Sequence, residues 1–412
     1  MAPRRPDKKS KKRDKAAISR AAGGGGGGGG DSKPVSPQVL VKAAEYHIQE
    51  GNIEDATKLA EKALDQSAAG SDDALSALNI LGQISLETGE FEAARAYFLR
   101  AVAIDEDGSR DESVGGGPEK FLCLAQLSEE GGKDSVAWFE KGAAALKGQI
   151  SALEDATTTG GPPSRRRNGN SNNQNGNNDD SERDVHLVDL KKKLAMTLCS
   201  VAEVYMTDLS WEEDAEKRCE ALTTEATMIA PDFAETWQTL ANVRISQSRI
   251  EDAKAALTRS LDLWKDLPPD DPSVPDFPSR VALARLLMEV EMEQEAIEVL
   301  ERLVSDDDQS VEVWYLGGWG LYVMGEKQRA AEKGGATAIE EDEWKTSWIS
   351  SRVWLNQCLH LYKLQDYEDE RLGEHANELL AAIAKELGEA PAGEGDEDDE
   401  WEDEGSDEEM KD

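Results

Sequence analysis

The sequence predicts an all-α fold built from repeated helix pairs, and two observations support this prediction. Apolar residues recur at intervals of three and four, as in Leu78, Leu81 and Ile84, which is the period of an α-helix rather than of a strand. Glycines and prolines stand between these periodic stretches, where one helix should end and the next begin. The glycines placed at such boundaries are Gly51, Gly89, Gly131 and Gly325.

The segment from Leu75 to Ile104 shows the repeated unit most clearly. Its first helix contains the pair Leu81-Gly82, and Gly89 marks the turn before a second helix. Small and large residues alternate on one face of the second helix, at Ala94, Phe98 and Ala101. This pattern resembles the tetratricopeptide repeat, in which small residues let paired helices approach closely and larger ones fill the space between neighbouring pairs.

Further units with the same marks are spread over residues 34–388. The clearest begin near Leu40, Trp237, Ala284 and Trp314, and weaker ones begin near Leu122 and Val201. The stretch from Trp354 to Leu387 is helical in pattern but lacks the small residues, which suits a carboxy-terminal cap. We therefore expect a tetratricopeptide superhelical solenoid of seven to eight helix pairs. The tryptophans expected to pack between its last repeats are Trp314, Trp344, Trp348 and Trp354.

The chain of 412 residues carries a formal net charge of -39, most of it on the predicted array. Residues 1–33 form a basic arm of +7 that includes eight consecutive glycines, and residues 389–412 form an acidic tail of -13. Removing both leaves -33 on residues 34–388. We expect the arm, the tail, an insert at residues 155–184 and the Gly-rich loop at residues 108–118 to be disordered, because few apolar residues offset their ordering entropy.

Composition argues against several classes of function. A strongly anionic body cannot neutralise phosphates, so we expect no direct binding to nucleic acid. No run of about 18 apolar residues could span a membrane, and the charged amino terminus lacks the apolar core of a secretory signal. We therefore expect no membrane partner and a protein that stays inside the cell. The cysteines lack the spacing of a disulfide framework or a zinc site, which predicts core thiols at Cys123, Cys199, Cys219 and Cys358.

The sequence shows no pattern of catalytic, cofactor-binding or metal-ligating residues. Its four histidines are isolated, and none belongs to an HExxH arrangement. The acidic run from Asp306 to Asp308 lacks the alternating ligands and central glycine of an EF-hand loop. We therefore expect a protein that is not an enzyme, with no catalytic residues, no cofactor and no metal.

In a tetratricopeptide solenoid the first helix of each pair lines a concave surface, so the repeat register predicts which side chains point into it. The predicted client-binding set is Glu45, Gln49, Gln83, Glu87, Glu203, Asp208, Glu235, Asn242, Glu289, Glu312, Tyr315, Trp319 and Tyr322. Carboxylates and aromatic faces bind Arg and Lys through charge-assisted hydrogen bonds and cation-π contacts. This set predicts a basic polypeptide as the partner, although any one of these acids could be an ordinary solvated residue.

Two alternatives stay open at this point. The same array could be a scaffold that assembles a multiprotein complex through apolar grooves, with its acidity serving only solubility. The basic arm, which includes the run from Lys8 to Lys15, fits a nuclear localisation signal better than an RNA-binding patch, and it could also fold back onto the acidic body.

The combined features resemble one family. A basic arm, an acidic array of this length, the stretch from Trp354 to Leu380 and the acidic tail around Trp401 are together similar to the fungal assembly chaperones dedicated to the fourth protein of the large ribosomal subunit. The resemblance implies a chaperone that holds the basic internal loop of that newly made protein, keeps it soluble and escorts it to nuclear pre-ribosomes. It also implies a location in cytoplasm and nucleus, with an import receptor reached through the client or the basic arm. The octaglycine and the insert depart from the family pattern.

Overall fold

The computed structural model describes residues 35–158, 176–334 and 342–388, and within these ranges the fold is all-α. One short 3-10 helix, η1 (Glu112–Val114), accompanies the α-helices, and the described residues contain no strand. The all-α prediction is therefore confirmed. The predicted basic arm and acidic tail lie outside the described residues. The chain divides into two compact units, residues 1–239 and residues 240–412.

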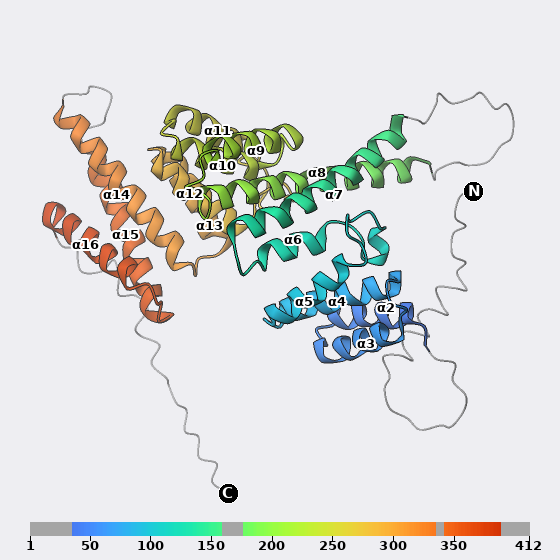
Figure 1. Cartoon of the computed structure of the whole chain (residues 1–412). Helices are drawn as coiled ribbons and strands as arrows, with labels where there is room; N and C mark the ends of the chain where they lie inside the picture. Colours follow the sequence, from blue (N-terminus) through green and yellow to red (C-terminus); the bar gives the residue numbers. More distant parts are fainter. Residues whose placement is uncertain (1–34, 159–175, 335–341, 389–412) are drawn as a thin grey trace, which may run out of the picture. The chain divides into compact units, whose positions relative to one another are not determined.

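Unit 1, residues 1–239, is a series of helix pairs in which each first helix packs against the second helix that follows it (Figure 1). Gly51 and Gly89 adopt φ angles of +75° and +76° at the turns within the first two pairs, a conformation that glycine adopts without steric cost. The pairs are α2 (Pro37–Gln49) with α3 (Ile53–Gln66), α4 (Asp72–Glu87) with α5 (Phe91–Val102), α6 (Glu119–Gln126) with α7 (Gly132–Thr158), and α8 (Gly176–Met206) with α9 (Ala215–Ile229).

Small side chains let the two helices of a pair approach closely, as the repeat pattern predicts. Ala56, Ala60 and Ala63 on α3 are fully buried. In the second pair, a Cβ atom at Gly82 would lie 2.7 Å from Phe98 Cε1, so only glycine leaves room for this ring. Phe98 itself is 1% exposed, and burying a side chain of this size contributes about 1.5–3 kcal/mol.

Unit 2, residues 240–412, also contains helix pairs, and in its described part the last helix, α16, packs against both helices of the last pair. The predicted tryptophan packing is confirmed, because Trp344 and Trp348 are buried and the ring centroids of Trp314 and Trp354 lie 4.7 Å apart. The helices are α10 (Ala234–Ser246), which crosses the boundary between the units, α11 (Ile250–Asp262), α12 (Phe277–Glu289), α13 (Glu293–Asp306), α14 (Val311–Lys333), α15 (Glu343–Leu364) and α16 (Glu370–Leu387).

The last helix pair shows that the predicted helix end at Gly325 is wrong. Helix α14 runs unbroken through Gly325, and α15 packs along it as its antiparallel partner. A Cβ atom at Gly325 would lie 2.6 Å from Trp348 Nε1, and one at Gly318 would lie 2.6 Å from Leu355 Cγ. These glycines therefore serve close packing between two long helices and not a turn. As a result, only α16 acts as the cap, whereas the cap was predicted to begin at Trp354.

The prediction of disorder over residues 155–184 is wrong for residues 155–158 and 176–184, which are helical. Helices α7 and α8 cover both ends of this insert, and residues 159–175 lie outside the described residues. The Arg183 guanidinium donates a hydrogen bond of 3.2 Å to the carbonyl oxygen of Leu153, which ties the two helices together beyond their apolar core. Both helices continue into polar sequence because extending a formed helix costs far less than nucleating one.

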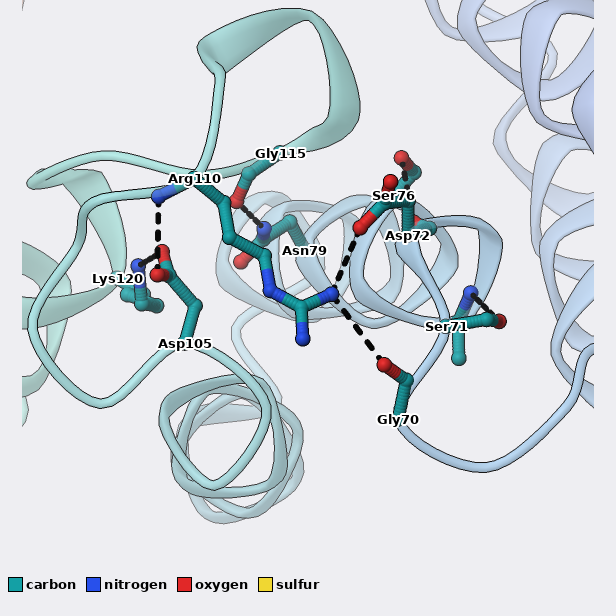
Figure 2. Close-up of polar contacts among 10 residues, drawn as sticks. Gly70, Ser71, Asp72, Ser76, Asn79, Asp105, Arg110, Gly115 and Lys120 are labelled. Carbon is teal, nitrogen blue, oxygen red and sulfur yellow. Dashed lines mark hydrogen bonds and ion pairs between the residues drawn. The ribbon is translucent and has the colours of Figure 1, made fainter.

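Residues 108–118, which were predicted to be disordered, form an ordered strap against the first helix of the second pair (Figure 2). Arg110 Nη1 donates a hydrogen bond to Asp72 Oδ1 at 2.7 Å, and Asn79 Nδ2 donates one to the Gly115 carbonyl oxygen at 2.5 Å. Asp72 and Asn79 lie two turns apart on α4. Polar contacts to this helix therefore order a segment whose composition offers little apolar burial.

A buried ion pair anchors the strap at its base (Figure 2). Lys120 Nζ lies 2.6 Å from Asp105 Oδ2, and both side chains are only 1% exposed. Lys120 also donates to the Gly117 carbonyl oxygen at 2.7 Å, and Asp105 Oδ1 accepts from the Arg110 backbone N–H at 3.1 Å. Burial lowers the pKa of Lys120, and the hydrogen bond and charge of Asp105 oppose this effect. Such additional hydrogen bonds are what allow a buried ion pair to persist.

We expect Gly325→Ala to lower the free energy of unfolding of unit 2 by about 1–3 kcal/mol, because the new methyl group would overlap Trp348. Gly320→Ala in the same helix is the matched control. A Cβ atom there would meet nothing closer than 3.7 Å, and alanine is favoured over glycine in a helix interior by about 1 kcal/mol. Urea unfolding measures both variants, and equal effects would contradict the packing role of Gly325.

We expect Lys120→Met to destabilise unit 1 by about 3–5 kcal/mol, since it leaves Asp105 buried without its cation. The double variant Asp105→Leu/Lys120→Met removes both charges and should recover part of this loss. A double-mutant cycle in urea unfolding measures that non-additivity. If Lys120→Met were as stable as the parent chain, the ion pair would not anchor the strap.

Candidate functional site

The predicted residues of the first repeat face solvent. Glu45 and Gln49 lie one turn apart on α2 and are exposed, whereas Leu40 and Ala44 of the same helix are buried. The helix is therefore amphipathic, and its apolar stripe holds it against the core. The opposite face has no packing role and can carry a carboxylate and an amide.

On α4 the strap leaves only part of the first-helix face open. Gln83 and Glu87, one turn apart in the carboxy-terminal half, are exposed. The amino-terminal half carries Asp72 and Asn79, which bind the strap. Sequence reasoning missed Asn79 and the strap because a repeat register does not reveal a loop that folds back over its own helix.

Two predicted carboxylates are partly desolvated although their side chains reach solvent. Burial raises the pKa of Glu203 on α8. Burial also raises the pKa of Glu45, and the charge of Lys42 opposes this effect. A carboxylate in such surroundings has lost part of its hydration, so a bound cation would restore favourable electrostatics that water supplies elsewhere. A positive charge placed beside either carboxylate would therefore lower its pKa again.

Helix α8 also carries three consecutive lysines, which sequence reasoning did not consider. Lys191 Nζ lies 2.8 Å from Glu154 of α7, and Lys193 forms an ion pair with Glu119 of α6. Carboxylates of neighbouring helices thus match two of the three positive charges. The lysine run consequently does not cancel the acidic character of unit 1.

Several other predicted residues already have partners. Asp208, just after α8, accepts a hydrogen bond of 3.1 Å from the backbone N–H of Gly132. Glu312 on α14 forms an ion pair with Arg285 of α12, so its charge is matched within unit 2. Of the other polar residues in the predicted set, Glu235 is half-buried, and Asn242 and Glu289 are exposed.

The predicted aromatic residues of α14 pack against helices α15 and α16. Tyr315 Oη lies 2.7 Å from Nδ1 of His375 on α16, and the rings of Trp319 and His375 are 5.8 Å apart. Tyr322 stacks on Trp348 with 5.2 Å between ring centroids. Trp319 remains 36% exposed, whereas Tyr315 and Tyr322 pack against the hydrophobic cluster around Trp344, Trp348 and Leu355. His375, which looked isolated in the sequence, is part of this cluster.

The described residues include side chains of metal-ligating and nucleophilic types. Within them, no group of three or more His, Cys, Asp or Glu side chains could hold a metal ion. Burial raises the pKa of Cys123 to about 11 and that of Cys199 and Cys358 to about 12, so these thiols stay protonated. The predicted core thiols are confirmed at Cys199, Cys219 and Cys358, while Cys123 is half-buried.

A separate finding concerns membranes. None of the helices in the described ranges is both long enough and apolar enough to cross a membrane.

Comparison with known proteins places the chain in a family. Residues 36–107 match the tetratricopeptide repeat family. A probable assembly chaperone of rpl4 from Emericella nidulans is 46% identical over 387 residues, which is 91% of each chain. A protein of the same description from Schizosaccharomyces pombe is 34% identical over 369 residues, covering 88% of this chain and 96% of that one. A solved structure of the assembly chaperone of RpL4 called Acl4 (residues 1–338) is 55% identical, with a TM-score of 0.64, and covers 72% of this chain and 100% of that one. The chain therefore belongs to the family of rpl4 assembly chaperones, which is built on tetratricopeptide repeats.

Proposed function

We propose that this protein is a dedicated chaperone that binds the basic internal loop of a newly made large-subunit ribosomal protein of the rpl4 type, for which its relatives are named. Loops of this kind are rich in Arg and Lys and bind RNA in the ribosome, so away from it they lack the phosphates that balance their charge. A surface of carboxylates substitutes for those phosphates and keeps the client soluble. This task requires binding and no catalysis.

Two observations carry the proposal: the similarity to relatives named as assembly chaperones of rpl4, one of them 46% identical, and the exposed carboxylate of Glu203 on α8. Burial raises the pKa of its side chain, and yet the side chain is exposed on the first helix of its pair, where the register predicts client contact. The net charge of -33 on residues 34–388 provides long-range attraction to a cationic chain. Short-range specificity then comes from hydrogen bonds between carboxylates and guanidinium or ammonium groups.

The escort part of the function follows from the same chemistry. A client whose basic loop is covered can travel from the cytoplasm to nuclear pre-ribosomes without binding other RNA on the way. We therefore propose that the protein occurs in both compartments and meets an import receptor through its client or through the basic arm at residues 1–33.

One observation favours the alternative of a scaffold that binds partners through apolar contacts. Helix α8 exposes Val188 and Met196, which are 50% and 54% accessible. A scaffold that relies on such residues would tolerate the loss of a carboxylate. Substitution of Glu203 therefore separates the two functions.

We expect Glu203→Gln to weaken binding of a peptide copied from the client's internal loop about tenfold, because one charge-assisted hydrogen bond is worth about 1.5–3 kcal/mol. Glu216→Gln is the matched control, since Glu216 is an exposed carboxylate on α9, the second helix of the same pair. Both variants change the net charge equally. Isothermal titration calorimetry at two salt concentrations measures the affinities, and equal effects of the two variants would favour the scaffold.

We expect client binding to weaken as the pH falls from 7 towards 5. Because the pKa of Glu203 is raised from 4.5, protons compete with the client at a higher pH than at an ordinary carboxylate, while Arg and Lys stay charged. The pH dependence should be shallower in Glu203→Gln. A carboxyl whose folded pKa exceeds its unfolded value gains stability as pH falls through the folded pKa, so unfolding at this site would not explain the loss. Identical pH profiles for both proteins would contradict this role of Glu203.

A further inference from the structure

A recess of about 750 Å³ lies between the α6–α7 connection and the α8–α9 connection of unit 1. Asp208 is the one residue of the predicted site that lines it. We name the recess the Trp211 recess. Its lining includes Glu130, Lys133, Asp208, Leu209, Trp211 and Glu212. Glu130 lies in the turn between α6 and α7, Lys133 lies in the first turn of α7, and the other four residues lie between α8 and α9.

Direct contacts between the two turns hold the recess in shape. The Gly132 backbone N–H donates a hydrogen bond to Asp208 Oδ2, and Gly132 adopts a φ angle of +41°. A Cβ atom at Gly132 would lie 3.1 Å from Leu209 Cδ2, and Leu209 is 3% exposed. The floor of the recess is therefore a packed contact that exists before any ligand arrives.

An exposed tryptophan ring forms one wall. Trp211 is 74% exposed, whereas Trp264, Trp344 and Trp348 are buried. A large ring left in water next to an apolar floor is typical of an interaction site, where tryptophan often contributes most of the binding energy. Trp211 lies within the weak repeat predicted to begin near Val201, and the repeat pattern does not indicate whether its ring is exposed.

Three carboxylates line the recess together with this ring, those of Glu130, Asp208 and Glu212. Lys133 Nζ lies 2.6 Å from Glu212 Oε1, so one negative charge of the recess is matched within the protein. Glu130 is exposed. Asp208 Oδ2 accepts a hydrogen bond from the Gly132 backbone N–H, but a carboxylate has two oxygens and can accept further hydrogen bonds from a ligand. An aromatic face beside carboxylates suits a guanidinium group, which stacks on the ring and donates hydrogen bonds in the same plane.

We propose that the Trp211 recess binds an arginine side chain of the basic client, stacked on Trp211 and bonded to Asp208 and Glu130. The proposal rests on the proposed function for the source of the arginine, but the chemistry of the recess stands apart from it. A lysine fits less well, because its ammonium group is strongly hydrated and cannot stack as a plane. The recess thus adds a contact point just after the carboxy-terminal end of α8, the helix that carries Glu203.

The test compares a nona-arginine peptide, a nona-lysine peptide and a peptide of the client's internal loop, each titrated into the full chain by calorimetry. We expect Trp211→Ala to weaken nona-arginine binding about tenfold and Trp211→Phe, which keeps a ring, about threefold. Nona-lysine binding should change less than twofold. Met228→Ala is the matched control, because Met228 is 77% exposed in the same repeat but does not line the recess. The unfolding temperature of each variant serves as the check on folding.

The outcomes separate this proposal from the proposed function. If Trp211→Ala and Met228→Ala bind nona-arginine equally, the proposal is overturned, even where the client peptide still binds. If nona-arginine binding depends on Trp211 and the client peptide does not bind the parent chain, the recess stands and the proposed function fails. Equal losses for arginine and lysine peptides would overturn the preference for a guanidinium group. If deletion of residues 1–33 strengthens binding only when Trp211 is present, the occupant is the chain's own basic arm, and the client assignment is wrong.

Discussion

The structure depends on close approach between the two helices of each pair. Where the backbones nearly touch, only glycine or alanine fits, as Gly82 beneath Phe98 and Gly325 beneath Trp348 show. This contact buries one face of each helix, and in α2 it leaves the opposite face, with Glu45 and Gln49, exposed. The fold can therefore present acids such as Glu45 and Glu203 without placing them in its core.

An acidic surface of this kind destabilises the folded protein through charge repulsion, which ion pairs between helices partly offset. A charge of -33 over residues 34–388 makes the folded array repel itself, and the partly desolvated carboxylates add to this effect. Ion pairs between neighbouring helices, such as Lys191 with Glu154 and Arg285 with Glu312, offset part of it. A cationic client would relieve the remainder, which gives the free protein a physical reason to bind one.

Much of the fold could be predicted because helix period and small-residue spacing are local properties of the sequence. The errors arose where the sequence pattern does not reveal which other residues a segment contacts. Gly325 looks like a turn glycine but permits helix packing, and residues 108–118 look disordered but are ordered by hydrogen bonds to α4. The site was harder to predict, because the exposure of Trp211 and the partnership of Tyr315 with His375 depend on contacts between distant segments.

The strap has a consequence for how the array comes apart. Repeat proteins are nearly one-dimensional, so each unit ordinarily gains stability only from its immediate interfaces and can fray from an end. The strap joins α4 to the start of α6 through Arg110, Asn79 and the buried pair of Lys120 with Asp105. Melting that starts at the amino terminus would therefore pause after the first repeat, since the second and third open together as one cooperative block.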